Sequence, residues 1–138
     1  MTTSHPTRHL LGAGLGPYGA DFGDLKDKVP GAEIKEIVAR NLKKANEYGF
    51  ICDNVIVNPF KPEEGIEVFK KAITTKHWDV VLIGYGVRRS DQLTNLLQIM
   101  INACHELSPH SKIIFDATPG EVWPALKLAY PEELGGCD

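Results

Sequence analysis

The chain has 138 residues, of which 43% are hydrophobic and 24% charged, and its formal net charge at pH 7 is −3. This length allows one domain with a real hydrophobic core, and the composition argues against disorder or low complexity. The acidic balance, with basic residues clustered only in pairs such as Arg88-Arg89, indicates neither a nucleic-acid partner nor an anionic membrane surface.

The three cysteines, Cys52, Cys104 and Cys137, lie far apart and form no C-x-x-C pair. This pattern predicts neither a disulfide scaffold nor a structural zinc site, and it favours a reducing compartment. The polar start and the short, glycine-rich apolar run after it do not make a convincing signal peptide, and no stretch approaches transmembrane length. We therefore expect a cytoplasmic protein.

The first predicted strand, His9–Leu15, is interrupted by glycines, and a long loop follows it from Gly16 to about Gly31. The loop shows neither helical nor strand periodicity. Loops of this length in compact domains are usually functional lids or disordered segments. Two aromatic residues in the loop, Tyr18 and Phe22, favour an ordered loop that covers a site.

The middle of the chain alternates between helix and strand. Apolar residues from Ile34 to Ala45 recur at helical spacing, and Gly49 stands where a C-terminal cap belongs. A strand at Ile51–Val57 and a helix from Pro62 to about Thr75 are predicted next. The run Asp79–Ile83 is almost wholly apolar, which is typical of a central parallel strand covered on both faces.

The last third of the chain predicts two further helices around one strand. The third helix is expected to follow Ser90, its N-cap, and to extend to about Leu107. After a strand at Lys112–Phe115, the run from Thr118 to Glu121 combines a capping box with a proline at the first helical position. Residues 1–7 and 131–138 are expected to be loosely held.

This alternation predicts a single α/β domain over residues 1–138, with parallel strands joined by right-handed crossovers. We expect a doubly wound, flavodoxin-like sheet of four strands in the order 2-1-3-4, with helices on both faces. Ligands of such sheets bind beyond the carboxyl ends of the strands, where the strand order reverses. Here that point lies between the first and third strands.

The turn after the third strand predicts an anion site. Gly84 and Gly86 allow a ligand to approach the backbone closely, and the helix that follows offers free N–H groups and the positive end of its dipole. Tyr85 lies in the same turn, and the guanidinium groups of Arg88 and Arg89 can hold a phosphate or carboxylate at two points. Alternatively, the glycines only make the turn and both arginines are solvated.

The other loops at this edge add further candidates. The expected ligand contacts there are Gly14, Gly16, Tyr18, Asn58 and Thr118. Asp21 and Asp116 are the candidate general bases, and Asp24, Tyr18 and Tyr85 are further acid–base candidates. Alternatively, Asp21 and Asp24 are ordinary turn residues, Asp116 binds local backbone N–H groups and Thr118 caps a helix.

The residues predict no cofactor. The run from Gly14 to Gly19 matches G-x-G-x-x-G, but no helix begins directly after it, and Asn58 replaces the acidic residue expected after the second strand. A nicotinamide dinucleotide is therefore not expected. A flavin mononucleotide is not expected either, because the first loop lacks the Ser/Thr-rich phosphate cradle of flavodoxins. The histidines form no metal-ligand set, so we expect no metal site.

Between Asp91 and Glu106 the third helix has no formal charge apart from a protonated His105. Ile99 and Ala103 fall off its expected sheet-facing stripe, so its outer face is uncharged and partly apolar. Such a face is more often covered than solvated, and we expect a twofold homodimer through this helix. The alternative is that loops of the same chain cover it. The stripe comprises Leu93, Leu96, Leu97, Met100, Ile101 and Cys104.

Three segments of the chain form a recognisable set: the strand and turn from Trp78 to Arg88, the helix with Asn102 and His105, and the turn from Ile113 to Pro119. Together they resemble small, single-domain α/β proteins of flavodoxin-like fold, a largely uncharacterised group. The resemblance covers about residues 8 to 130. It implies the fold and brings no established catalytic residues to this chain.

Response-regulator receiver domains share this size and architecture but require acidic residues at the ends of the first and third strands. This chain has Gly14–Gly16 and Gly84-Tyr85 there, so phosphorelay signalling is not expected.

The sequence thus predicts a small-metabolite enzyme or binding protein. A compact anionic ligand would rest on the turn from Gly84 to Ser90 with Arg88 as its anchor, and the loop with Tyr18 and Asp21 would close over it. Any chemistry would be metal-free acid–base catalysis. The alternative function is a non-catalytic homodimeric module whose third helix recognises a protein partner.

Overall fold

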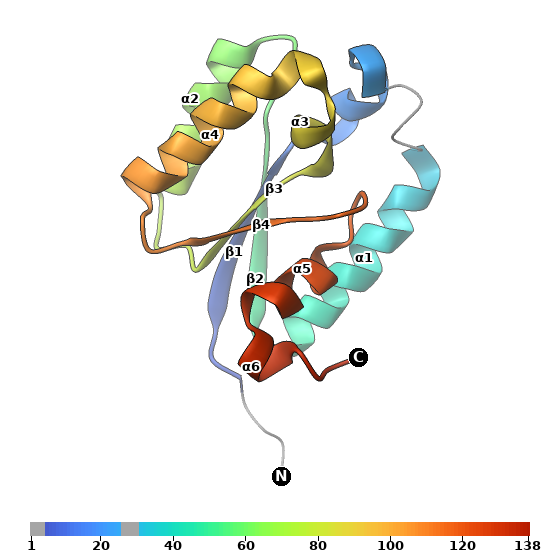
Figure 1. Ribbon diagram of the computed structural model, residues 1–138, viewed down its shortest axis with the longest axis vertical. Coiled ribbons are helices and arrows are strands. Elements are labelled where there is room, and N and C mark those ends of the chain that lie inside the picture. The colour runs from blue at the N-terminus through green and yellow to red at the C-terminus, as the bar shows by residue number, and fades with distance from the viewer. Residues whose placement is uncertain (1–4, 26–30) are drawn as a thin grey trace.

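The computed structural model describes residues 5–25 and 31–138, and these form one sheet of parallel strands flanked by helices (Figure 1). The strand order is β2-β1-β3-β4, and each neighbouring pair is parallel. The predicted order 2-1-3-4 is confirmed, and the fold is consistent with the flavodoxin-like class. The strands are β1 Arg8–Gly14, β2 Phe50–Ile56, β3 Val80–Ile83 and β4 Lys112–Phe115.

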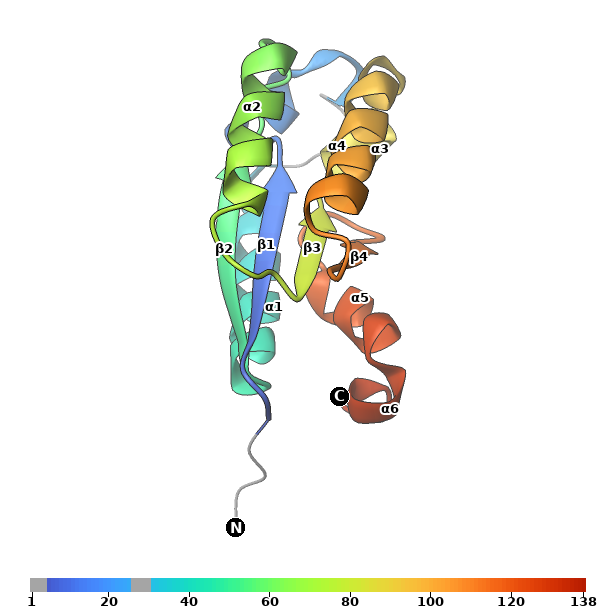
Figure 2. The same ribbon diagram turned by 90° about the vertical axis from the view of Figure 1, so that its left-hand side faces the viewer.

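The helices form a layer on each face of the sheet (Figure 2). Helices α2 and α4 cover one face, whereas α1 and α5 cover the other. In the described part of the chain, no helix is both long and apolar enough to span a membrane. The α-helices are α1 Gly31–Glu47, α2 Pro62–Ile73, α3 Tyr85–Arg89, α4 Thr94–Leu107, α5 Val122–Ala129 and α6 Pro131–Leu134; the 3₁₀ turns are η1 Gly16–Asp21, η2 Gly23–Leu25 and η3 Asp91–Leu93.

Successive residues of the strands contribute side chains to two separate hydrophobic cores, because side chains alternate between the faces of a sheet. Leu11 and Ile83 point to α2 and α4 and are at most 2% exposed. Leu10, Val80 and Ile114 point to α1 and α5. The site described below lies on this second face.

The long third helix predicted after Ser90 is interrupted in the structure. The short helix α3 ends at Arg89, Ser90 is extended, and the turn η3 leads into α4. A physical reason lies in Val87 and Leu93, which are both buried. In a continuous helix they would point about 120° apart, since each residue turns about 100°. The break at Ser90 lets both side chains enter the core.

The fourth helix begins later than the capping box predicts, and that prediction is wrong. Thr118 donates a hydrogen bond to the Glu121 carboxylate, but both residues belong to a turn before α5. Gly120 has a φ of 82°, a left-handed conformation that cannot continue a helix. The α5 N-terminus is instead capped from α1, because the Trp123 N–H donates to Asn41 Oδ1 at 2.9 Å.

Two further segments differ from expectation. The tail expected to be loose contains α6, whose Leu134 is completely buried, and Glu133 accepts two hydrogen bonds of 2.9 Å from Arg8. Residues 1–4 lie outside the described residues. On α4, Ala103 is buried although we expected it off the sheet-facing stripe. It lies three residues after Met100, so it shares that face.

Residues 16–25 of the loop after β1 have a regular structure, since most of them belong to the turns η1 and η2. Its η1 and η2 turns pack through aromatic rings, with Tyr18 and Phe22 at 6.1 and 5.2 Å from the Phe60 ring. Leu25 is completely buried. Residues 26–30 of the predicted loop lie outside the described part of the chain.

Candidate functional site

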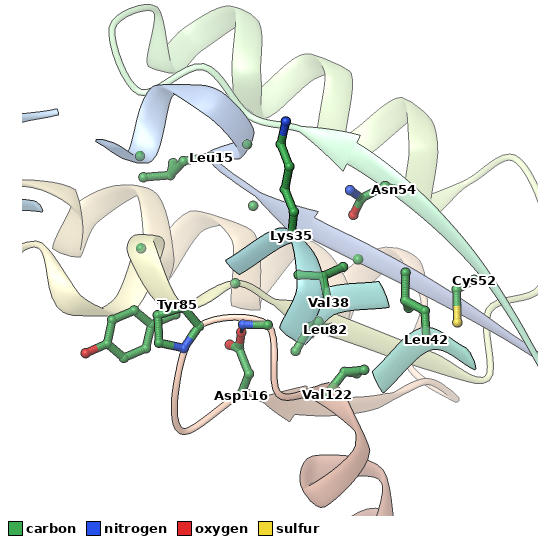
Figure 3. A pocket seen from close by; sticks show the side chains of 18 of the residues that line it. Leu15, Lys35, Val38, Leu42, Cys52, Asn54, Leu82, Tyr85, Asp116 and Val122 are labelled. Atoms are coloured by element: carbon green, nitrogen blue, oxygen red, sulfur yellow. Dashed lines mark hydrogen bonds between the residues drawn. The ribbon is translucent and has the colours of Figure 1, made fainter. Parts of the chain in front are cut away.

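A cavity of about 500 Å³ lies between α1 and the sheet, toward the carboxyl ends of β1 and β3 (Figure 3). The strand order reverses here, because β1 has β2 as its neighbour on one side and β3 as its neighbour on the other. The cavity extends from the loops at this edge down the face of the sheet to Leu10.

Three glycines that lack side chains line the floor of this cavity. Gly12 and Gly14 lie two and four residues after Leu10 and therefore face the same side of the sheet. Gly84, directly after β3, lies beside Gly14: a Cβ built on Gly84 would be 3.2 Å from the Gly14 Cα. The three glycines form a floor of bare backbone beneath α1.

The walls around this glycine floor are largely apolar. Val38 and Leu42 line the cavity from α1, and Leu82 lines it from β3. Leu15 and Val122 contribute from the ends of the loops. A ligand would therefore place most of its surface against aliphatic side chains.

Two polar side chains from different elements also line the cavity. Lys35 on α1 is exposed and forms no ion pair with any described residue, and in Figure 3 it extends away from α1 on the side of Leu15 and Asn54. Asn54 is paired in register with Gly12, and its Oδ1 would lie 2.7 Å from a Cβ on that glycine. Its amide thus uses space that any other residue at position 12 would occupy.

Two further lining residues of β2 contribute less chemistry. The Asp53 carboxylate points to the opposite face, where it pairs with Lys76 at 3.5 Å. Cys52 does face the cavity, but burial raises the pKa of its thiol to about 11. The neutral thiol is therefore an apolar wall group at pH 7 rather than a nucleophile.

Asp116 follows β4 and lines the cavity with a carboxylate that is almost entirely buried, at 4% residue exposure. Its Oδ1 accepts a hydrogen bond from Arg88 Nη2 at 3.1 Å, and its Oδ2 accepts one from the Gly120 N–H at 3.1 Å. Burial raises the pKa of Asp116, although these hydrogen bonds and the charge of Arg88 oppose that shift.

Arg88 forms an ion pair with this carboxylate. Its Nη2 also donates to the Asp116 backbone carbonyl, and its guanidinium lies 5.1 and 5.7 Å from the ring centroids of Phe115 and Tyr85. Arg88 does not line the cavity. The helix that starts at Tyr85 has only five residues, so it supplies little of the dipole expected at this turn.

The structure brings half of the sequence-predicted site residues together. Those that line the cavity are Gly14, Gly16, Gly84, Tyr85, Gly86 and Asp116. Those that lie elsewhere are Tyr18, Asp21, Asn58, Arg88, Arg89 and Thr118.

Local contacts occupy several of the residues outside the cavity. Asn58 Oδ1 accepts a hydrogen bond from the Phe60 N–H at 2.9 Å, a typical turn contact. Arg89 is exposed above the Tyr85 ring, and Asp21 is exposed at the end of η1. The side chain of Asp24 lies outside the described residues.

Several cavity residues were not predicted from the sequence, because they lie outside the loops at the strand ends. Lys35, Val38 and Leu42 belong to α1, and Gly12 and Asn54 lie within strands. One signal was available: two glycines separated by one residue in a strand leave a gap on one face.

In the described residues, no group of three or more His, Cys, Asp or Glu side chains could hold a metal ion. No protein-family model matches the chain, and no curated protein matches it.

Proposed function

We propose that this protein binds a compact anionic metabolite in the cavity between α1 and the sheet. The observation that carries this proposal is the cavity at the switch point of the sheet, whose floor includes the backbone of Gly12, Gly14 and Gly84. Pockets of about 300–1,000 Å³ with mostly apolar walls and a few polar groups are typical of small-molecule sites. The cavity fits that description.

Lys35 is the cation best placed to meet the anionic group. Among the described residues that line the cavity, it alone carries a lysine or arginine charge. Arg88, the anchor expected from the sequence, instead holds Asp116. The proposed anion position therefore lies at α1 rather than on the turn after β3.

A catalytic step, if the protein performs one, would use Asp116 as acid or base, because it is the carboxylate that faces the cavity. The three cysteines are free thiols, which supports the reducing, cytoplasmic location that we propose.

Two matched dyes test the proposal. 1-Anilinonaphthalene-8-sulfonate and N-phenyl-1-naphthylamine share one apolar body, and only the first carries a negative charge. We expect the sulfonate to bind more tightly than the neutral dye, and Lys35→Met to weaken it by about tenfold, the scale of one charge-assisted hydrogen bond. Lys43→Met, an exposed lysine on the same helix and outside the cavity, is the matched control.

Alkylation of Cys52 reports where the dye binds, because this thiol lines the cavity. Labelling is run at pH 9, since the pKa of about 11 makes the thiol slow to react at neutral pH. The sulfonate dye should slow labelling of Cys52, measured by peptide mass spectrometry. Dye binding that leaves Cys52 labelling unchanged would contradict the proposed site.

A second candidate function is self-association through α4. The outward row of this helix is exposed and carries no formal charge, and its Ile99 is 38% exposed. Sedimentation velocity should show a dimer at micromolar concentration that Ile99→Arg dissociates. A monomer at that concentration would exclude this candidate. The row comprises Asn95, Gln98, Ile99 and Asn102.

A further inference from the structure

Asp116 poses a question that anion binding alone does not answer. An anionic ligand gains nothing from a second negative charge in its pocket, yet a buried carboxylate lines this cavity. A buried carboxylate is stable only where hydrogen bonds satisfy it. Its remaining acceptor capacity therefore indicates what the ligand presents there.

The carboxylate has acceptor sites to spare. An ionised carboxylate offers about four lone-pair sites on its two oxygens. Oδ1 accepts from Arg88 Nη2 and Oδ2 accepts from the Gly120 N–H. The backbone N–H of Asp116 itself also donates to the carboxylate. At least one of the four sites therefore remains for a donor on the ligand.

The surroundings of Asp116 hold it in one orientation. Arg88 binds both its carboxylate and its backbone carbonyl. The turn that supplies the Gly120 N–H packs tightly on α1, since a Cβ at Gly120 would lie 2.8 Å from Val38 Cγ2. A carboxylate fixed in this way can favour a ligand by geometry as well as by charge.

Asp116 and Lys35 come from different walls of the cavity, and they form no ion pair with each other (Figure 3). Asp116 follows β4, whereas Lys35 lies on α1. Between them the lining is aliphatic, including Val38 and Leu82. The two charged groups that face the cavity, Lys35 and Asp116, are therefore separate points with an apolar surface between them.

We propose that Asp116 selects ligands with a hydrogen-bond donor, a hydroxyl or an amine, at the end opposite their anionic group. This inference rests on the proposed function and names its ligand class: hydroxy- or amino-substituted acids with an apolar, ring-sized body. Arg88 is a positioning residue in this scheme, because it touches Asp116 and not the cavity.

The test compares 3-phenylpropionate with its three ring-hydroxylated derivatives, which are isomers of one another, as competitors of the sulfonate dye. These compounds share the acid and the apolar body and differ only in a donor. At least one isomer should displace the dye about tenfold more effectively than the parent acid, the effect of one hydrogen bond to a charged group. This comparison uses the unaltered protein, so it does not depend on any variant folding.

Asp116→Asn then separates recognition from a purely structural role. Recognition predicts that the hydroxyl preference disappears while the affinity for the parent acid stays the same. A structural role alone predicts that both affinities fall together. Asp91→Asn, an exposed carboxylate on η3, is the control and should keep the preference.

The outcomes also distinguish this inference from the proposed function. If no isomer exceeds the parent acid, or no phenylpropionate displaces the dye, donor selection is overturned while the anion site stands. If the dye itself fails to bind, the proposed function falls, and the inference falls with it.

Discussion

The two faces of the sheet are built from the same strands, yet near the carboxyl ends of β1 and β3 only one of them is filled. Toward α2 and α4, Ala13 and Ile83 are at most 2% exposed and belong to one continuous core. Toward α1, the neighbouring positions Gly12, Gly14 and Gly84 have no side chains, and a cavity of about 500 Å³ lies above them. At this end of the sheet, one face is packed and the other is open, although both faces have a hydrophobic core.

This difference follows from the two-residue period of a strand. In β1 the larger residues Leu11 and Ala13 alternate with Gly12 and Gly14, so the change from a filled to an open face occurs between adjacent residues. Removing side chains from a strand weakens it, since glycine packs nothing and orders at a greater entropic cost. The packed face compensates for that cost, which explains how the sheet can tolerate an open face.

The largest effect on stability is expected on the packed face. Ile83 is fully buried against the α2 and α4 core. Replacing it with alanine should lower the free energy of unfolding by about 4 kcal/mol, because the surrounding core cannot collapse into the gap. Urea denaturation measures this loss. A loss below about 1 kcal/mol would show that this face is not tightly packed.

The neighbouring residue gives the matched comparison on the open face. Leu82 is only partly buried and borders the cavity. Leu82→Ala should cost about 2 kcal/mol, the low end for such truncations, because fewer contacts are lost. Equal losses for Leu82→Ala and Ile83→Ala in the same urea titration would contradict the proposed difference between the faces.

Asp116 predicts a smaller, pH-dependent effect. Burial raises the pKa of its carboxyl above the usual 3.8, so the folded protein holds this proton more tightly than the unfolded chain. The stability of the wild type relative to Asp116→Asn is therefore greatest below pH 3.8 and falls as pH rises through the folded pKa. The slope cannot exceed about 1.4 kcal/mol per pH unit for one proton.

Urea titrations of both proteins across this pH range measure that slope. A difference that rises with pH would mean that Arg88 and Gly120 outweigh burial and that the pKa of Asp116 is lowered instead.

Much of the fold could be predicted from the sequence because its signals are local. The apolar run of β3, the helical spacing of α1 and the proline at the start of α2 are such signals. Every predicted strand lies within one residue of its observed position. The break at Ser90 was less accessible, since it depends on burying Val87 and Leu93 in one core. Likewise, the cap of α5 comes from Asn41, which is 82 residues from its partner Trp123.

The candidate site was predicted less completely. The glycines after β1 and β3 and the carboxylate of Asp116 were identified because strand ends are where ligands bind. Arg88 appeared to be available because nothing in the sequence pairs it with Asp116, which is 28 residues away. Lys35 could not be told from the other lysines of α1, because its position at the cavity depends on how that helix lies on the sheet.

The glycine floor can be tested by filling it. Gly14 has no positive φ, and a Cβ there meets nothing closer than the Gly84 Cα at 3.8 Å, so a side chain fits the backbone without strain. Gly14→Phe would place an aromatic ring in the cavity, and Gly136→Phe, where a Cβ meets nothing within 4 Å, is the control.

The most direct measurement is a fluorescence titration of both variants with 1-anilinonaphthalene-8-sulfonate. Our account predicts at least about tenfold weaker binding by Gly14→Phe, equal to 1.4 kcal/mol, and unchanged binding by Gly136→Phe. If Gly14→Phe binds the dye as tightly as the wild type, the cavity above the glycine floor is not the binding site.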